Sequence, residues 1–397
     1  MWWPPTRPCS GTSSRGIRRP GPDRDSGMTR WGGWRRPKTY VLVNHWTRTI
    51  SDGIGNYSRA VLDELRRWGI DTAFITRDEG VSDADYRTCV LNAVTTRFSS
   101  TQIVVEAPEV ACPTLLLPPE YRVHVRLHCP NALVQAHNEQ PVDWEQFGQE
   151  LEVARRAHAV SSPSYALLRE LRPFLDVSRI HVYKSPPPAG VTPFDAGSKR
   201  HDVVFLGRFR RVKGVDFLNP VLSALPPSYS VVLGGRGSEA FALSPSVRCR
   251  VSARGEVCGQ ERYQLLGEAR VVLMLSRFEN CSMLVLECLA VGTVVVGWQV
   301  GGHAEIAGPD LIRLVPFGDT DALVAAVVAS VEGTRPTLDR FRAATGRVAE
   351  DFRRGWRHVW DSVPGGRGVY RGLDASGGAE GGATAAPFLD GARPASP

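Results

Sequence analysis

The sequence predicts an α/β protein with two Rossmann-like parallel-sheet domains that face each other across a cleft. Short β-type runs alternate with helical patterns through most of the 397 residues, which is typical of parallel sheets covered by helices. A proline-rich stretch within residues 184–198 separates an earlier β/α series from a later one. Because ligands of such sheets bind at the carboxyl ends of the strands, we expect the site in the cleft.

The first series is predicted to form a domain over residues 38–185. Its clearest element is a helix at 56–68, because Tyr57, Val61 and Leu65 share one helical face and Gly69 stands where a helix-ending glycine belongs. A long loop from Asn44 precedes this helix. The other expected elements are strands at 40–43, 72–76, 103–105, 123–127 and 159–161 and a helix at 144–157.

The second series is predicted to form a domain over residues 199–335. It repeats the alternation of apolar β-type runs and helical patterns. The expected elements are strands at 203–206, 231–233, 271–275 and 293–296, helices at 261–269, 282–290 and 320–330, and a further helical pattern at 338–360.

The net charge of +7 is confined to the start of the chain. Residues 1–38 hold eight arginines and Lys38 against Asp23 and Asp25, so residues 39–397 carry equal numbers of cations and anions. A nucleic-acid binder would spread its positive charge over a folded face, so we expect no nucleic-acid partner. Residues 1–37 and 363–397 are rich in glycine, proline and other small residues, and we expect them to be disordered.

Cysteine usage and hydropathy predict a cytoplasmic protein without a transmembrane segment. The eight cysteines form no C-x-x-C pair and no spacing suited to zinc, so we expect reduced thiols. No run reaches the ~18 apolar residues that a membrane span needs, and no apolar core of a secretory signal is present. Whether Met1 or Met28 is the true start is left open.

Two cations follow the first strand of the second domain. Arg208 comes directly after the strand and Gly207, and Lys213 follows a few residues later. Cations at the carboxyl end of a strand, with glycines that allow close backbone approach, suit a diphosphate. The alternative is a pair of solvated charges on a turn.

A second group of candidate site residues lies between the expected strand at 271–275 and the helix that follows, and in that helix. The first turn of that helix offers unpaired N–H groups and a positive dipole end to an anion. Glu279 lies in the preceding loop and Glu287 inside the helix among apolar neighbours, where an unbound carboxylate is costly. Hydroxyl groups of a sugar or a ribose could donate hydrogen bonds to both carboxylates. The alternative for Glu287 is an ion pair with a surface arginine.

The order of four motifs resembles the donor domain of retaining, family-4 glycosyltransferases with the GT-B fold. These motifs are Gly207-Arg208 with Lys213-Gly214, then Gly234-Gly235-Arg236-Gly237, then Glu279 and Glu287 in E-x7-E spacing, then Gly301-Gly302-His303-Ala304-Glu305. The resemblance covers residues 203–323. It implies that Arg208 and Lys213 hold the diphosphate of a nucleotide sugar, that Glu279 contacts the transferred sugar and that Glu287 contacts the ribose.

The resemblance also supplies the other donor-side and catalytic candidates. Gly207, Gly235 and the loop residues Asn280, Cys281 and Ser282 are expected to bind the donor, with Asn280 and Ser282 capping the helix. In relatives, glycines and an aromatic commonly stand in this loop, so the sugar pocket is expected to differ.

The first domain resembles the same family at three places. Gly53 and Gly55 resemble its glycine-rich loop before the first helix, which approaches the donor phosphates and the acceptor. His128 resembles a strand-end histidine near the anomeric centre; the alternative is a structural histidine. Residues 336–362 resemble the closing helix that crosses back to the first domain.

The functional hypothesis is transfer of a hexose from a nucleotide-diphosphate sugar to an acceptor hydroxyl, with retention at the anomeric carbon. Arg208, Lys213 and the helix N-terminus would stabilise the leaving diphosphate, so no metal and no cofactor beyond the nucleotide-sugar co-substrate is expected. Asp83 and Asp85 have a metal-like spacing, but we expect them in a surface loop.

The acceptor is left open as a small molecule, a lipid or a glycan, in bacterial specialised-metabolite or cell-envelope glycan synthesis. Two other classes stay open. One is a catalytically silent sugar-nucleotide-binding protein. The other is an NAD-dependent oxidoreductase, disfavoured by the long loop before Gly53.

Overall fold

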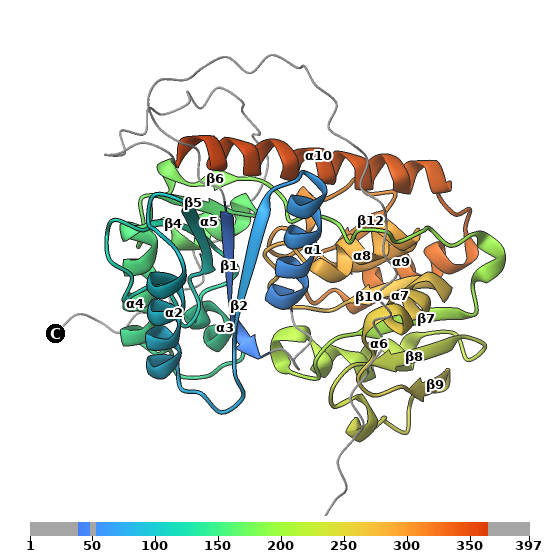
Figure 1. Ribbon diagram of the computed structural model, residues 1–397. Helices are drawn as coiled ribbons and strands as arrows, with labels where there is room; N and C mark the ends of the chain where they lie inside the picture. The colour runs from blue at the N-terminus through green and yellow to red at the C-terminus, as the bar shows by residue number, and fades with distance from the viewer. Residues whose placement is uncertain (1–38, 48–52, 364–397) are drawn as a thin grey trace, which may run out of the picture. The chain divides into compact units, whose positions relative to one another are not determined.

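The computed structural model describes residues 39–47 and 53–363 and places their strands in two six-stranded parallel sheets (Figure 1). The first sheet has the order β2-β1-β3-β4-β5-β6, and every neighbouring pair is parallel. Its strands are β1 (Thr39–Thr47), β2 (Asp71–Arg77), β3 (Ile103–Pro108), β4 (Arg122–Arg126), β5 (Ala159–Ser162) and β6 (His181–Val182). The helices between them are α1 (Gly53–Arg67), α2 (Asp83–Arg97), α3 (Asn131–His137), α4 (Trp144–Arg156), α5 (Tyr165–Leu171) and the 3₁₀ turn η1 (Val177–Arg179).

The second sheet has the order β12-β11-β10-β7-β8-β9 and is also parallel throughout. Its strands are β7 (His201–Leu206), β8 (Ser230–Gly234), β9 (Arg250–Ala253), β10 (Ala269–Met274), β11 (Val294–Trp298) and β12 (Ile312–Val315). Its helices are α6 (Leu218–Ala224), α7 (Gly259–Glu268), α8 (Met283–Val291), α9 (Thr320–Glu332) and α10 (Leu338–Ser362). Short 3₁₀ turns complete it: η2 (Ala196–Ser198), η3 (Arg211–Lys213), η4 (Val215–Phe217), η5 (Ser238–Ala240) and η6 (His303–Glu305).

The central strands form because both of their faces are covered by helices. All six residues of β3 and all five of β11 are buried, which is the continuous apolar pattern of a parallel strand packed on both sides. On α1, the buried residues Tyr57, Val61 and Leu65 recur at helical spacing and form its core face, as predicted.

Strand order reverses once in each sheet, and this reversal positions the functional loops. The chain leaves β1 toward β2 on one side and then crosses to β3 on the other; β7 and β10 are related in the same way. The loops that follow two such neighbouring strands run in opposite directions, and this opens a crevice at the carboxyl edge of the sheet. The loops after β7 and β10 carry Arg208, Lys213 and Glu279.

The last helix, α10, contacts α8 beside the second sheet and β5 and β6 in the first (Figure 1). Its aromatic side chains drive this packing. The Trp356 ring lies 5.2 Å from that of Tyr40 and 5.4 Å from that of Trp68, and it stacks on Trp360 at 5.2 Å. Gly355 is required by close approach, because a Cβ there would lie 2.3 Å from Tyr183.

Two expected loops are wrong. The first is the long loop from Asn44, because β1 runs to Thr47 and α1 already begins at Gly53. The second is the loop at Asp83. Asp83 and Asp85 do not lie in a surface loop; they form the first turn of α2, where the Ser82 hydroxyl accepts a hydrogen bond from the Asp85 N–H at 3.1 Å. Carboxylates in a first turn are stabilised by the helix dipole, so this pair is a helix start. The short helices α3, α5 and α6 and the edge strands β6, β9 and β12 were not predicted.

The disorder expected for residues 1–37 and 363–397 and the choice between Met1 and Met28 concern residues that, except for Val363, lie outside the described ranges. Val363 is buried at the end of α10, contrary to the expected disorder. None of the helices in the described ranges combines the length and the apolar character that a bilayer span requires.

Candidate active site

A cavity of about 440 Å³ lies at the carboxyl ends of both sheets. From the second sheet it is lined by the loop after β7, the loop after β10 and the first turn of α8; from the first sheet it is lined by the start of α1, the end of β4 and α3. The predicted residues that line it are Gly53, His128, Gly207, Arg208, Lys213, Gly235, Glu279, Asn280, Cys281 and Ser282.

Two of the lining residues form an ion pair, between Lys213 Nζ and Glu279 Oε1. Ser276 Oγ also donates a hydrogen bond to this carboxylate oxygen at 2.7 Å. Burial alone would raise the pKa of Glu279, but the charges of Lys213 and His303 and the two hydrogen bonds outweigh it and lower the pKa. The Glu279 carboxylate is therefore ionised, and the positive charge of Lys213 balances its negative charge.

Two glycines hold the loop that carries Glu279. The Gly302 N–H donates to Glu279 O at 2.8 Å, and a Cβ on Gly302 would lie 2.0 Å from Asn280 O. Gly301 has a φ of +53°, and a Cβ there would lie 2.0 Å from Glu279 O. Only glycine fits such distances, so this glycine pair sets the position of the carboxylate.

We expected Asn280 and Ser282 to cap α8 with their side chains, and this expectation is wrong. Ser282 occupies the N-cap position, but its side chain makes no capping hydrogen bond. Asn280 Nδ2 instead donates to His128 O at 2.6 Å, and its Oδ1 accepts from the Ser164 hydroxyl. The side chain of Asn280 therefore ties the donor loop to the first sheet, while the first turn of α8 still faces the cavity.

Glu287 is buried, but it does not line the cavity. Arg262, on α7, donates to Glu287 Oε2 from Nε at 2.7 Å and lies 2.6 Å away through Nη2, and Asn56 Nδ2 approaches Oε1 at 3.5 Å. Burial raises the pKa of Glu287, although Arg262 opposes this. The arginine pair left open by the sequence is thus present, although Arg262 is only 17% exposed and is no surface arginine. Arg262 itself lines the cavity.

The glycines before α1 belong to the helix itself. The structure starts α1 at Gly53, so Gly53 and Gly55 lie in its first turn and not in a preceding loop. Gly53 lines the cavity, whereas Gly55 is buried and does not. Asn56 and Tyr57, which the sequence did not single out as site residues, also line it.

His128 lies two residues after β4, with its ring 4.8 Å from that of Tyr57, edge to face. Its backbone N–H donates to both carboxylate oxygens of Glu109, at 3.0 and 2.9 Å. Burial and then the nearby Arg126 charge lower the pKa of His128 to about 3, so its imidazole is neutral. Glu109 follows β3 directly, at the same edge of the sheet, and was missed by the sequence analysis although that position could have identified it.

A buried polar network supports Tyr57 and His128 from behind. Glu106 accepts hydrogen bonds from Tyr40 at 2.6 Å and Tyr57 at 2.8 Å. His124 lies 3.1 Å from the same carboxylate. The Arg126 guanidinium lies 5.4 Å from the centre of the Tyr57 ring. The network holds the Tyr57 ring at the cavity from inside the sheet.

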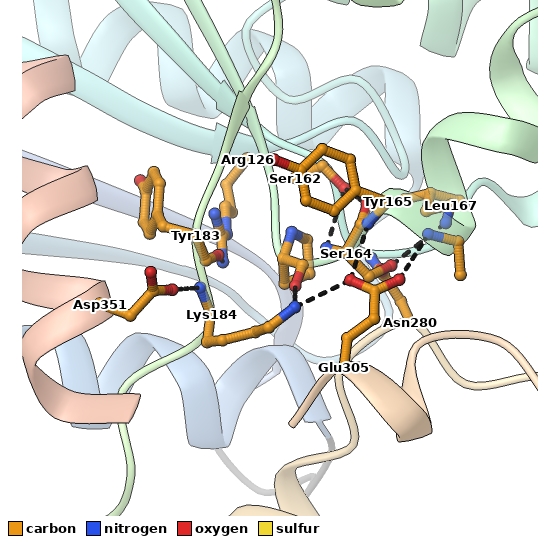
Figure 2. A network of polar contacts seen from close by, with 12 residues as sticks. Arg126, Ser162, Ser164, Tyr165, Leu167, Tyr183, Lys184, Asn280, Glu305 and Asp351 are labelled. Atoms are coloured by element: carbon orange, nitrogen blue, oxygen red, sulfur yellow. Dashed lines mark hydrogen bonds and ion pairs between the residues drawn. The ribbon is translucent and has the colours of Figure 1, made fainter. Parts of the chain in front are cut away.

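A second network joins the two sheets beside the cavity (Figure 2). Glu305, on η6, accepts the backbone N–H groups of Tyr165 at 3.0 Å and Ala166 at 2.9 Å, the first residues of α5. It also pairs with Lys184 Nζ at 2.9 Å. The Lys184 N–H in turn donates to Asp351 of α10 at 2.7 Å. The start of the proline-rich connector is therefore fixed on both sides.

We expect Glu305→Gln to lower the free energy of unfolding by about 2 kcal/mol, because a mostly buried lysine loses its charged partner and a helix start loses one acceptor. The urea midpoint measures this. Glu350→Gln is a matched control: Glu350 pairs with Arg353 on the exposed face of α10, and its loss is expected to cost less than about 0.5 kcal/mol. Equal effects of the two substitutions would contradict the assignment.

Within the described residues, no group of three or more His, Cys, Asp or Glu side chains is arranged to hold a metal ion. Asp83, one half of the metal-like pair, forms an ion pair with Arg77.

Comparison with solved structures identifies the fold class. Sucrose-phosphate synthase from Thermosynechococcus elongatus matches with a TM-score of 0.65 at 15% identity, over 83% of this chain and 100% of that one. HepE from Anabaena in complex with UDP-glucose matches with a TM-score of 0.62 at 14% identity, over 81% of this chain and 99% of that one. The chain has the GT-B fold of glycosyltransferases.

The part of the chain that forms the second sheet matches a known protein family. Residues 200–332 match the family model described as "Glycosyl transferases group 1". Among curated proteins, alpha-maltose-1-phosphate synthase from Mycolicibacterium smegmatis is 25% identical over 244 residues, which are 53% of this chain and 62% of that protein. The chain thus spans less than two thirds of this relative, and the part that carries Arg208, Lys213, Glu279 and Glu287 is a glycosyl transferases group 1 domain.

Proposed function

We propose that the protein is a retaining, family-4-type glycosyltransferase that moves a hexose from a nucleotide-diphosphate sugar to an acceptor hydroxyl. The observation that carries the proposal is that Arg208, Lys213, Glu279 and the start of α8, all from the matched domain, line one cavity. The UDP-glucose in the Anabaena structure makes UDP-glucose the first donor to test.

The cations have a defined task in this reaction. When the bond between the anomeric carbon and the diphosphate oxygen breaks, negative charge grows on the diphosphate, and Arg208, Lys213 and the N–H groups of α8 stabilise it. Lys213 turns from Glu279 to the phosphate, and the freed Glu279 carboxylate accepts the sugar hydroxyls.

The acceptor oxygen bonds to the anomeric carbon on the face that the diphosphate leaves, and its proton passes to the departing phosphate oxygen. Neutral His128 contacts the sugar without adding a charge. Since two side-chain cations and the start of α8 can stabilise the negative charge of the leaving diphosphate, we propose that the reaction needs no metal.

Calorimetry with UDP-glucose, GDP-mannose and ADP-glucose tests the donor. We expect one of them to bind, and Arg208→Ala to weaken its affinity by about tenfold or more, since a charge-assisted phosphate contact contributes roughly 1.5–3 kcal/mol. Proton NMR of the product gives the anomeric configuration, and turnover in EDTA tests metal independence. Absence of binding to all three donors and their free diphosphates would defeat the proposal.

A silent sugar-nucleotide-binding protein is the second candidate, and the Glu287–Arg262 pair favours it, because it occupies the carboxylate that the ribose would use. Such a protein would bind the donor but would neither transfer nor hydrolyse it. Steady donor hydrolysis by the purified chain would exclude this candidate.

A further inference from the structure

The part of the cavity beside α3 differs in chemistry from the part beside the donor cations. Five lining residues form what we call the α3 wall: Val110, Leu133, Val134, His137 and Phe278. All lysines and arginines among the described lining residues come from the second sheet and its loops: Arg208, Arg210, Lys213, Arg236 and Arg262. None of the described lining residues before position 200 is a lysine, arginine, aspartate or glutamate.

The histidines on this side add no charge. Burial and then the Arg277 charge lower the pKa of His137 to about 4, and the pKa of His128 is about 3. Both imidazoles are therefore neutral at physiological pH. None of the five α3-wall residues is a lysine or arginine, so a phosphate or carboxylate placed against Val134 and Leu133 would lose hydration without gaining a cation from the wall, which is costly.

The α3 wall is fixed to the donor cations by direct contacts. Asn138 Oδ1 accepts the Val212 N–H at 2.8 Å, and Arg211 forms an ion pair with Glu139, so the end of α3 is held against η3, which carries Lys213. The His137 ring stacks on Phe278 at 5.4 Å and 19°. Phe278 directly precedes Glu279. A molecule on this wall therefore presents its hydroxyl beside Glu279 and Lys213.

We propose that the α3 wall binds the acceptor, and that the acceptor is an uncharged molecule with an apolar or aromatic group next to its reacting hydroxyl. The inference rests on the proposed glycosyl transfer and narrows its acceptor. An aryl ring suits the wall because its residues are apolar or uncharged, and it already includes the stacked rings of His137 and Phe278. A sugar phosphate does not suit it.

Three acceptors that share glucose test the proposal: 4-nitrophenyl β-D-glucoside, glucose and glucose 6-phosphate. With the donor that calorimetry identifies, we expect kcat/KM for the aryl glycoside to exceed that for glucose by about tenfold or more, through burial of the ring, and glucose 6-phosphate to be the poorest. Mass spectrometry of the products measures the transfer. A preference for glucose 6-phosphate, or equal use and equal binding of all three, would overturn the proposal.

Val134→Arg tests the wall itself. We expect the KM for the aryl glycoside to rise by about tenfold or more, because the charge and bulk displace the ring, while affinity for the donor changes by less than about threefold. Leu116→Arg, at an exposed leucine outside the cavity, is the matched control and should leave transfer unchanged. An unchanged KM in Val134→Arg would refute the wall as the acceptor site.

The outcomes separate the two proposals. A wild-type chain that neither binds nor hydrolyses any nucleotide sugar contradicts the proposed function, and the acceptor inference falls with it. Donor hydrolysis combined with a preference for phosphorylated acceptors contradicts the acceptor inference alone.

Discussion

Lys213→Ala is expected to reduce sugar transfer by about a hundred- to a thousandfold, the range seen when one preorganised charge-stabilising group is removed. Lys213 is the cation that pairs with Glu279, and it lies where the diphosphate is proposed to leave. Steady-state kinetics should show the loss in kcat as well as in kcat/KM, because the interaction strengthens as the leaving group gains charge.

Stability must be separated from catalysis in this variant. Lys213→Ala leaves the mostly buried Glu279 carboxylate without its cation, which by itself destabilises the fold by roughly 3 kcal/mol. The double variant Lys213→Ala/Glu279→Gln removes that unpaired charge, so thermal stability should recover while transfer stays low. Arg248→Ala, an exposed cation of the same domain outside the cavity, should transfer normally. Full activity of the double variant would contradict the role of Lys213.

Glu150→Gln is expected to stabilise the protein at pH 8 by an amount on the order of 3 kcal/mol. Glu150 lies on α4 and is only 1% exposed; its Oε2 accepts the Asn131 N–H at 3.0 Å. Burial, and then the charge of Glu109, raise the pKa of Glu150 to about 9. A glutamine keeps the acceptor for Asn131 and, because it is never charged, removes the cost of taking up a proton on folding at this pH.

The sign follows from proton binding. In the unfolded chain a glutamate titrates near pH 4.3, so between about pH 5 and 8 the folded protein holds a proton on Glu150 that the unfolded chain has lost. Stability therefore falls as pH rises through this window, by about 1.4 kcal/mol per pH unit. Glu109, with a pKa raised by burial to about 7, adds a slope of the same sign.

Urea midpoints at pH 5 and pH 8 measure both effects. Glu150→Gln should lose part of the pH slope and keep the part that comes from Glu109. Glu152→Gln, at an exposed position of the same helix, should change the free energy of unfolding by less than about 0.5 kcal/mol at either pH. A Glu150→Gln protein that is less stable at pH 8, or that keeps the full slope, would contradict the assignment.

The sequence predicted the central strands well, because a parallel strand covered on both faces leaves an uninterrupted apolar run such as β11. Helix α2 was missed although Tyr86, Val90 and Val94 recur every four residues and are all buried. Its two aspartates were taken for loop residues, whereas Ser82 before them was a readable N-cap. The edge strands were missed because β9 is mostly exposed and β6 has only two residues.

Site residues could be predicted where they directly follow a strand. Contacts between side chains that are distant in the sequence could not be predicted. Arg208 and Lys213 were located by the end of β7, and the same reasoning at β3 would have given Glu109. No local pattern indicates that Arg262 pairs with Glu287, because the two residues lie on different helices. The roles assigned to these residues stay predictions until the variants above are measured.

Glu279 and Asn280 are neighbours in the chain, yet their side chains serve different halves of the molecule. Glu279 holds Lys213 in the second half, and Asn280 holds the carbonyl of His128 in the first. One peptide unit therefore links the loop that carries the carboxylate to the segment that leads into α3. In the proposed reaction this link joins the donor side of the cavity to its acceptor side.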